Sequence, residues 1–228
     1  MNKTEKENKE ISLQISEYLL QIKAIKLNIS KPFTWASGWK SPIYCDNRKI
    51  LSFPKVRTFV RQELAKRIND EYGTTDVIAG VATGGIAIGA LVAQDLGLPF
   101  VYVRASEKQH GLNNQIEGVV KPNQSVVVIE DLISTGRTSL EVVKVLKDAG
   151  CKIQGMIAIF TYGFKIAEEN FKKAKCPLNT LLDYDILIQQ AVDSDYIRES
   201  DLLSLVKWRD NPEDWKNKIE SKKQNNND

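Results

Sequence analysis

The chain has 228 residues, 42% hydrophobic and 27% charged, with a formal net charge of +3. This is enough for one soluble globular domain with a substantial core. The net charge is too small to indicate nucleic-acid binding, and no apolar run approaches the ~20 residues that span a bilayer.

The first ten residues, MNKTEKENKE, are polar and charged. We therefore expect residues 1–10 to be disordered and not to form a signal peptide. Cys45, Cys151 and Cys176 are odd in number and lack metal-ligand spacing, so reduced thiols in a cytoplasmic protein are the simplest interpretation. A nucleophilic cysteine would need a basic partner nearby, and the single histidine, His110, belongs to a different segment.

Apolar residues at helical spacing predict an amphipathic helix over 11–23. The next segment, FTWASGWKSPIYCDNR over 33–48, places four aromatic residues among Gly, Ser and Pro. Such a loop either packs on the core or forms a platform for a flat ring, and composition by itself favours packing.

Strands and helices then alternate. The patterns predict helices over 54–72, from about 87 to 96, from the turn at 134–139 to about 150, and over 167–174. They predict strands at 77–81, 100–103, 126–129 and 153–160. Residues 181–182 suggest an edge strand, 183–208 two helices, and 217–228 a disordered tail. We expect a single α/β domain over 1–228, with a mostly parallel sheet flanked by helices.

Val126–Ser139, VVVIEDLISTGRTS, is the most informative stretch. A buried strand runs directly into Glu130 and Asp131, and small hydroxyl residues around Gly136 then open a helix. Free backbone N–H groups at a helix start suit a phosphate, and the carboxylates suit sugar hydroxyls or a hydrated divalent cation. The sequence therefore indicates a ribose-phosphate site, with an ordinary βα turn as the alternative.

A second strand and glycine turn, Ala82–Ala87, offers another anion site. Both turns follow strands, so both are expected at the carboxyl edge of the sheet, where α/β proteins bind ligands. Arg104–Gly118 is a long polar loop containing Lys108 and His110. Loops of this length in a compact domain are functional or disordered.

The hydrophobic run, paired acids and S-T-G-x-T closely resemble the phosphoribosyl-pyrophosphate (PRPP) signature of type I phosphoribosyltransferases. The pattern S-G-x-x-S-P-x-Y-x-D-x-R, from Ser37 to Arg48, and R-x-x-x-K-x-H-G, from Arg104, are similar to the orotate phosphoribosyltransferases. The resemblance implies the type I fold, with residues of about 24–50 as an N-terminal hood over the active site.

The resemblance also implies roles for individual residues. Lys108, His110 and Asp131 would be catalytic, and Ser134, Lys26 and Phe33 would bind orotate. PRPP would be bound by Thr83, Gly84, Arg104, Lys108, His110, Glu130, Asp131, Leu132, Ile133, Ser134, Thr135, Gly136, Arg137 and Thr138. Two positions depart from the family pattern: Ala105 replaces a frequent lysine, and Tyr162 replaces an arginine that touches the pyrimidine in some members.

The implied reaction transfers the 5-phosphoribosyl group from PRPP to orotate, giving orotidine 5′-monophosphate and pyrophosphate in pyrimidine (UMP) synthesis. Mg²⁺ would be held mainly through PRPP, with no dedicated protein metal site. The family commonly forms homodimers in which the mobile loop of one subunit reaches the other's site. No nucleic-acid or membrane partner is expected.

Two other functions remain alternatives. A purine or uracil phosphoribosyltransferase would share the PRPP site, but the hood pattern argues against it. A non-catalytic PRPP-sensing regulator that binds nucleic acid would need a basic surface, and the net charge of +3 gives no support for one.

Overall fold

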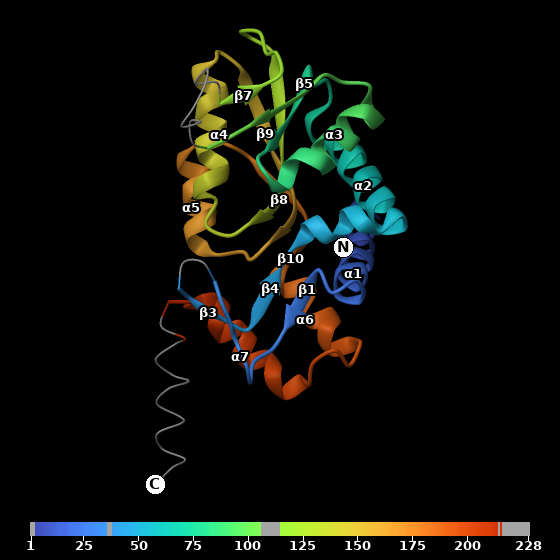
Figure 1. Ribbon diagram of the computed structural model, residues 1–228. Coiled ribbons are helices and arrows are strands. Elements are labelled where there is room, and N and C mark those ends of the chain that lie inside the picture. Colours follow the sequence, from blue (N-terminus) through green and yellow to red (C-terminus); the bar gives the residue numbers. More distant parts are fainter. Residues whose placement is uncertain (1–2, 36–37, 106–114, 214, 216–228) are drawn as a thin grey trace.

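The computed structural model describes residues 3–35, 38–105, 115–213 and 215. Its centre is a six-stranded sheet in the order β10-β9-β8-β5-β6-β7 (Figure 1). The strands are β5 (Val77–Val81), β6 (Phe100–Val103), β7 (Ile116–Glu117), β8 (Ser125–Ile133), β9 (Lys152–Thr161) and β10 (Leu178–Asp183). All neighbouring pairs are parallel except β6 and β7. The expected mostly parallel sheet is confirmed.

Helices cover both faces of this sheet because its central strands are apolar on both sides. Val126, Val127, Val128 and Ile129 are fully buried, and alternate residues belong to two separate hydrophobic clusters. Helices α4 (Arg137–Asp148) and α5 (Lys165–Lys173) pack on one face, and α2 (Pro54–Tyr72) and α3 (Gly84–Leu96) on the other (Figure 1). Among the described helices, none is long and apolar enough to cross a membrane.

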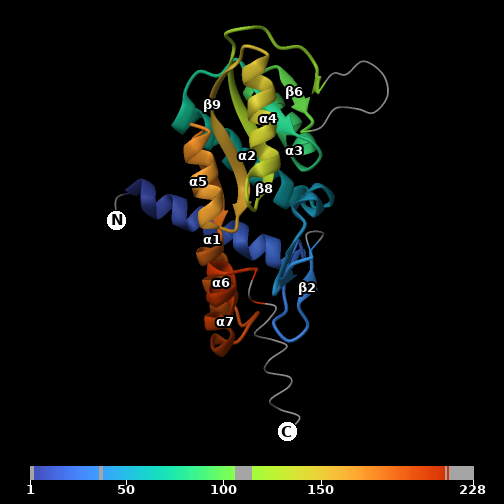
Figure 2. The same ribbon diagram turned by 90° about the vertical axis from the view of Figure 1, so that its left-hand side faces the viewer.

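The hood consists of two small antiparallel pairs placed beside the end of the sheet. Strand β1 (Ile25–Leu27) pairs with β4 (Ile43–Cys45), and β2 (Phe33–Thr34) pairs with β3 (Lys40–Ser41). A 3₁₀ helix, η1 (Asn47–Ser52), leads from the hood into α2. Figure 2 shows the hood next to α6 (Tyr184–Asp193) and α7 (Glu199–Asp210) at one end of the molecule.

The expected disorder of residues 1–10 is wrong for residues 3–10. Helix α1 spans Lys3–Gln21, so it begins eight residues before the predicted helix. The polar first turns are held by contacts with α2: Asn8 Oδ1 accepts a 2.7 Å hydrogen bond from Arg67, and Glu7 forms an ion pair with Lys66. These partners lie 59 positions away in sequence, so local composition could not reveal them. The predicted disordered tail, 217–228, lies outside the described residues.

Strand β8 is longer than the sequence predicts. The sequence predicts that it ends at Ile129 with the two acids beyond it, but it continues to Ile133. Its pairing with β9 extends to Ile133 opposite Thr161, and this keeps Glu130 and Asp131 in extended backbone. Their side chains therefore project from the strand itself, where the backbone is more rigid than in a turn.

Candidate active site

The two glycine turns meet at the carboxyl edge of the sheet, as the sequence predicts. They enclose a pocket of about 240 Å³. Its lining residues are Val81, Ala82, Thr83, Gly84, Glu130, Asp131, Leu132, Ser134, Thr135, Gly136, Arg137, Thr138 and Ser139. The structure thus brings most of the predicted PRPP-binding residues to one site, although the turns are nearly 50 positions apart.

The first turn packs directly against the acids of β8. A Cβ atom on Gly84 would lie 2.2 Å from Asp131 Oδ1, and one on Gly85 would lie 2.4 Å from the backbone oxygen of Ile129. Only glycine allows the start of α3 to approach β8 so closely. The peptide bond between Ala82 and Thr83 is cis.

The second turn also depends on a glycine. Gly136 has φ +72°, and a Cβ atom there would lie 2.5 Å from a ring carbon of Phe171. Gly136 precedes the first residue of α4, and no side chain caps the helix there. The helix N-terminus therefore offers its N–H groups and the positive end of its dipole to an anion. From α5, Asn170 Nδ2 donates a 3.0 Å hydrogen bond to the Thr135 carbonyl and holds the turn.

The paired acids lie in an environment that disfavours their charge. Glu130 is 6% exposed, and its carboxyl accepts hydrogen bonds from Ser139 Oγ at 2.8 Å and from the Asp131 backbone N–H at 3.0 Å. Burial raises the pKa of Glu130 well above its usual value, and the charge of Asp131 raises it further. Burial also raises the pKa of Asp131, although its contact with Glu130 and the positive charge of Arg48 act in the opposite direction. The pair is therefore suited to receive hydroxyl donors or positive charge.

Of the predicted cationic loop, only its first residues are described. Arg104 follows β6, its guanidinium lies 5.5 Å from the Tyr102 ring centroid, and its Nε is buried without a hydrogen-bond partner in the described part of the chain. Its backbone N–H donates 2.9 Å to the carbonyl of Gln115, across the base of the loop. Lys108 and His110 lie outside the described residues, so their roles stay predictions.

Lys26 and Phe33, predicted to bind orotate, lie on the hood and not in the 240 Å³ pocket. Lys26 pairs in register with Tyr44, and the rings of Phe33 and Tyr44 are 5.7 Å apart. Tyr44 therefore lies next to both Lys26 and Phe33, which only the family resemblance had connected. Ser134, the third predicted orotate residue, does line the pocket.

Comparison with known proteins agrees with this geometry. The family model described as "Phosphoribosyl transferase domain" matches residues 55–193. The orotate phosphoribosyltransferase of Porphyromonas gingivalis is 55% identical over 201 residues, covering 88% of this chain and 96% of that protein. This chain belongs to the orotate phosphoribosyltransferases of the type I phosphoribosyltransferase family.

A second relative and a solved structure are also similar to this orotate phosphoribosyltransferase. The orotate phosphoribosyltransferase of Bacteroides thetaiotaomicron is 54% identical over 207 residues, which are 91% of this chain and 98% of that protein. The crystal structure of orotate phosphoribosyltransferase from Aeropyrum pernix has a TM-score of 0.69 at 24% identity, covering 80% of this chain and 99% of that one. The structural likeness confirms the type I fold.

Tyr162, where some family members have arginine, belongs to an aromatic cluster under the hood. It is 2% exposed, stacks on Phe164 at 5.4 Å, and lies 5.0 Å from the ring of Trp35. Trp208 of α7 packs edge-on against Trp35 at 5.6 Å, and its Nε1 donates a 3.2 Å hydrogen bond to the Lys40 carbonyl. Trp35 therefore packs on the core, as the composition of the hood segment favoured, and it attaches the hood to the C-terminal helices.

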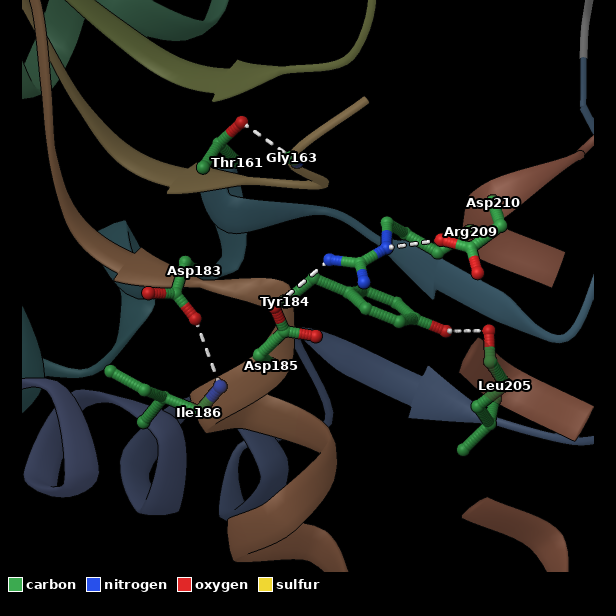
Figure 3. Close-up of polar contacts among 9 residues, drawn as sticks. All are labelled: Thr161, Gly163, Asp183, Tyr184, Asp185, Ile186, Leu205, Arg209 and Asp210. Carbon is green, nitrogen blue, oxygen red and sulfur yellow. Dashed lines mark hydrogen bonds and ion pairs between the residues drawn. The ribbon is translucent and has the colours of Figure 1, made fainter. Parts of the chain in front are cut away.

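The C-terminal helices are in turn fixed to each other. The Tyr184 hydroxyl donates 3.2 Å to the Leu205 carbonyl, and Arg209 Nη1 forms a 2.9 Å ion pair with Asp185 (Figure 3). A hollow of about 550 Å³ beside Arg209 includes Thr135 but neither Glu130 nor Asp131, so it is distinct from the pocket between the two glycine turns.

One residue beside this site carries no signal in the sequence. Asn47 occupies an unspecified position of the D-x-R pattern, yet its side chain is buried and donates a 2.7 Å hydrogen bond to the Asp131 carbonyl. Nothing local distinguishes it from other asparagines in loops, because its partner is 84 positions away.

Proposed function

We propose that this chain transfers the 5-phosphoribosyl group from PRPP to orotate, giving orotidine 5′-monophosphate and pyrophosphate in pyrimidine synthesis. The observation that carries the phosphoribosyl part is the pocket in which two glycine turns flank the buried Glu130 and the half-buried Asp131. The acceptor is supported by the relatives named orotate phosphoribosyltransferase, at 54–55% identity over most of the chain.

Each part of the pocket has a proposed role. Residues from Thr135 to Ser139 receive the 5′-phosphate at the start of α4, where free N–H groups and the helix dipole favour an anion. Glu130 and Asp131 accept hydrogen bonds from the ribose hydroxyls, with Asp131 near the anomeric carbon. Thr83 and Gly84 hold the pyrophosphate, and Ser134 contacts orotate.

The reaction needs no covalent nucleophile. An orotate nitrogen attacks the anomeric carbon while pyrophosphate leaves, and positive charge builds on the ribose as in other glycosyl transfers. Asp131 stabilises that charge. Arg104, with Lys108 and His110, would close over the pyrophosphate, stabilise its negative charge and keep out water that would hydrolyse the sugar.

Mg²⁺ fits this site as a partner of the substrate. Glu130 and Asp131 offer hard carboxylate oxygens, and the described residues contain no group of three or more His, Cys, Asp or Glu that could hold an ion alone. We propose that the ion is bound mainly through PRPP and water, with the acids close by. When bound, it neutralises charge on the pyrophosphate leaving group.

Residues 1–228 act as one phosphoribosyltransferase domain in the cytoplasm. The chain forms a homodimer in which the loop carrying Lys108 and His110 serves the partner's site.

The test is an assay of PRPP-dependent orotate consumption with and without Mg²⁺, compared with uracil and hypoxanthine as acceptors. We expect turnover with orotate only, and a fall in kcat of at least tenfold, about 1.4 kcal/mol, for Lys108→Ala. Turnover of uracil or hypoxanthine in place of orotate would contradict the proposed acceptor. A mobility shift with DNA or RNA and no turnover would favour the regulator.

A further inference from the structure

Asn47 links the hood to the acid-bearing strand. It is the first residue of η1, two positions after β4, the last strand of the hood, and it is only 2% exposed. Its Nδ2 donates 2.7 Å to the backbone carbonyl of Asp131. A buried side-chain amide that donates to a backbone carbonyl restrains the position of that peptide group.

The orientation of the amide is determined by its two partners. The Asp131 carbonyl can only accept, so the NH₂ group of Asn47 must face it. On the other side, the thiol of Cys45 lies 3.3 Å from Asn47 Oδ1 and donates to it. Burial, with the nearby charges of Asp131 and Asp46, raises the pKa of Cys45 well above its usual value, so the thiol keeps its proton.

The sheet explains why β8 needs this contact. Pairing between β5 and β8 ends at Gly80 opposite Ile129, whereas pairing between β8 and β9 continues to Ile133. Asp131 therefore lies on a stretch of β8 that has lost one of its neighbouring strands. Asn47 supplies a donor to this stretch from a segment that continues directly from β4 of the hood.

We propose that Asn47 is a positioning residue that fixes Asp131 for the reaction and couples the placement of the hood to the placement of the acids. This inference rests on the proposed function, because the role of Asp131 toward the ribose does. Asn47 does not itself line the 240 Å³ pocket. Asn47 holds the backbone from which the Asp131 carboxylate projects. A shift of the hood would therefore also shift Asp131.

The experiment is a double-mutant cycle on the full chain with orotate and PRPP. If Asn47 acts through Asp131, Asn47→Ala lowers kcat/KM about tenfold in the wild-type background and less than twofold in an Asp131→Asn background. A merely structural role would give equal losses in both backgrounds, and that result would overturn the proposal. No loss in the wild-type background would overturn it too.

Two further variants separate positioning from folding. Asn47→Asp keeps the shape but cannot donate to the carbonyl when ionised, so we expect at least the loss of Asn47→Ala where the carboxyl is ionised. We expect partial recovery, relative to wild type at the same pH, as the pH is lowered and the carboxyl regains its proton. Asn179→Ala on edge strand β10 removes another amide, one that donates a 3.0 Å hydrogen bond to the Tyr72 hydroxyl, and it should leave kcat unchanged. A pH-independent loss in Asn47→Asp would count against the donor role.

Failure of the proposed function is recognised separately. If the wild-type protein does not turn over orotate, the reaction is wrong, and the cycle is repeated on the affinity for PRPP and Mg²⁺. Asn47→Ala should then weaken PRPP binding in the wild-type background more than in the Asp131→Asn background. Equal weakening in the two would reject the positioning role whatever the acceptor.

Discussion

At the residue scale, Glu130 and Asp131 are placed for function in a way that lowers the free energy of unfolding. Glu130 is buried beside Asp131, where each carboxylate is partly removed from water and close to a like charge. Such an arrangement favours the binding of hydroxyls and cations, because these donors compensate the charge that burial penalises. The free protein therefore holds a strained pair, and substrate is expected to relieve it.

Replacement of Glu130 by glutamine should separate stability from activity. An acid whose pKa is raised in the folded state binds more protons there, so its contribution to the free energy of unfolding falls as pH rises from its ordinary pKa of 4.5 through the folded value. Glu130→Gln cannot ionise, so we expect a gain on the order of 1 kcal/mol at pH 8 and little change at pH 4. Turnover should fall. Urea unfolding at pH 8 and at pH 4 measures the free energy of unfolding, and steady-state kinetics measure turnover.

Asp76 supplies a control of opposite sign. The Ser125 hydroxyl and backbone N–H each donate 2.7 Å to Asp76 Oδ2, and these bonds lower the pKa of Asp76. Its stabilising contribution is present above the unfolded pKa and is lost as pH falls. Asp76→Asn should therefore reduce the free energy of unfolding at pH 8 without changing turnover.

The outcome that would contradict the Glu130 prediction is a loss of stability at pH 8 in Glu130→Gln. That result would refute the account of the buried acid.

At the scale of elements, the hood is held by the C-terminal helices. The cluster of Trp35, Tyr162, Phe164 and Trp208 fills the space between the hood, the end of β9 and α7. The indole of Trp208 also reaches the β3 backbone at Lys40. Residues more than 160 positions apart thus set the position of the segment expected to cover orotate.

Trp208→Phe tests this attachment. The smaller ring keeps apolar contact but cannot donate to the Lys40 carbonyl, so we expect a loss of about 1–3 kcal/mol in the free energy of unfolding. Because the hood carries Lys26 and Phe33, the KM for orotate should rise several-fold while the KM for PRPP changes little. Chemical denaturation and initial rates with each substrate varied in turn give both quantities.

Leu203 on the same helix is the matched control. It is 62% exposed, so Leu203→Ala should change stability by no more than about 0.5 kcal/mol and leave both KM values as they are. Equal increases of the two KM values in Trp208→Phe would mean that α7 supports the whole domain and not the hood in particular.

At the scale of the whole molecule, the sheet brings the two glycine turns and the acids together, and the proposed cationic residues belong to a loop. Both glycine turns and the acids lie at the carboxyl edge of adjacent strands β5 and β8. The loop of Lys108 and His110 starts at the end of β6, on the other side of β5. In the proposed homodimer, this loop completes the partner's pocket.

Mixed dimers test that arrangement. Lys108→Ala and Asp131→Asn should each be nearly inactive alone. Unfolded together and refolded, they should regain about a quarter of wild-type turnover, because half of the dimers are mixed and each mixed dimer has one intact site. Refolding each variant alone is the control. No recovery in mixtures shown to contain mixed dimers would mean that the loop serves its own subunit.

The sequence by itself determined the alternation of strands and helices and the two glycine turns. These features depend on neighbours in the chain: β-branched runs, helical spacing, and glycines where the backbone turns. The boundaries of α2 and β5 and the joining of the turns at one edge follow from such patterns and from the parallel sheet. The acceptor was predicted from resemblance, and it is the relatives that support it.

Only the tertiary structure decided what depends on distant partners. Residues 3–10 are helical because α2 holds them, and the acids lie within β8 because β9 continues beside them. Asn47 is part of the site because the chain returns to place the Asp131 carbonyl against it. A hydrogen bond across 84 positions leaves no local signal, since either residue could occur in the same short pattern without the other. Such contacts between distant residues are set by the packing of the folded chain, and neither composition nor residue spacing predicts them.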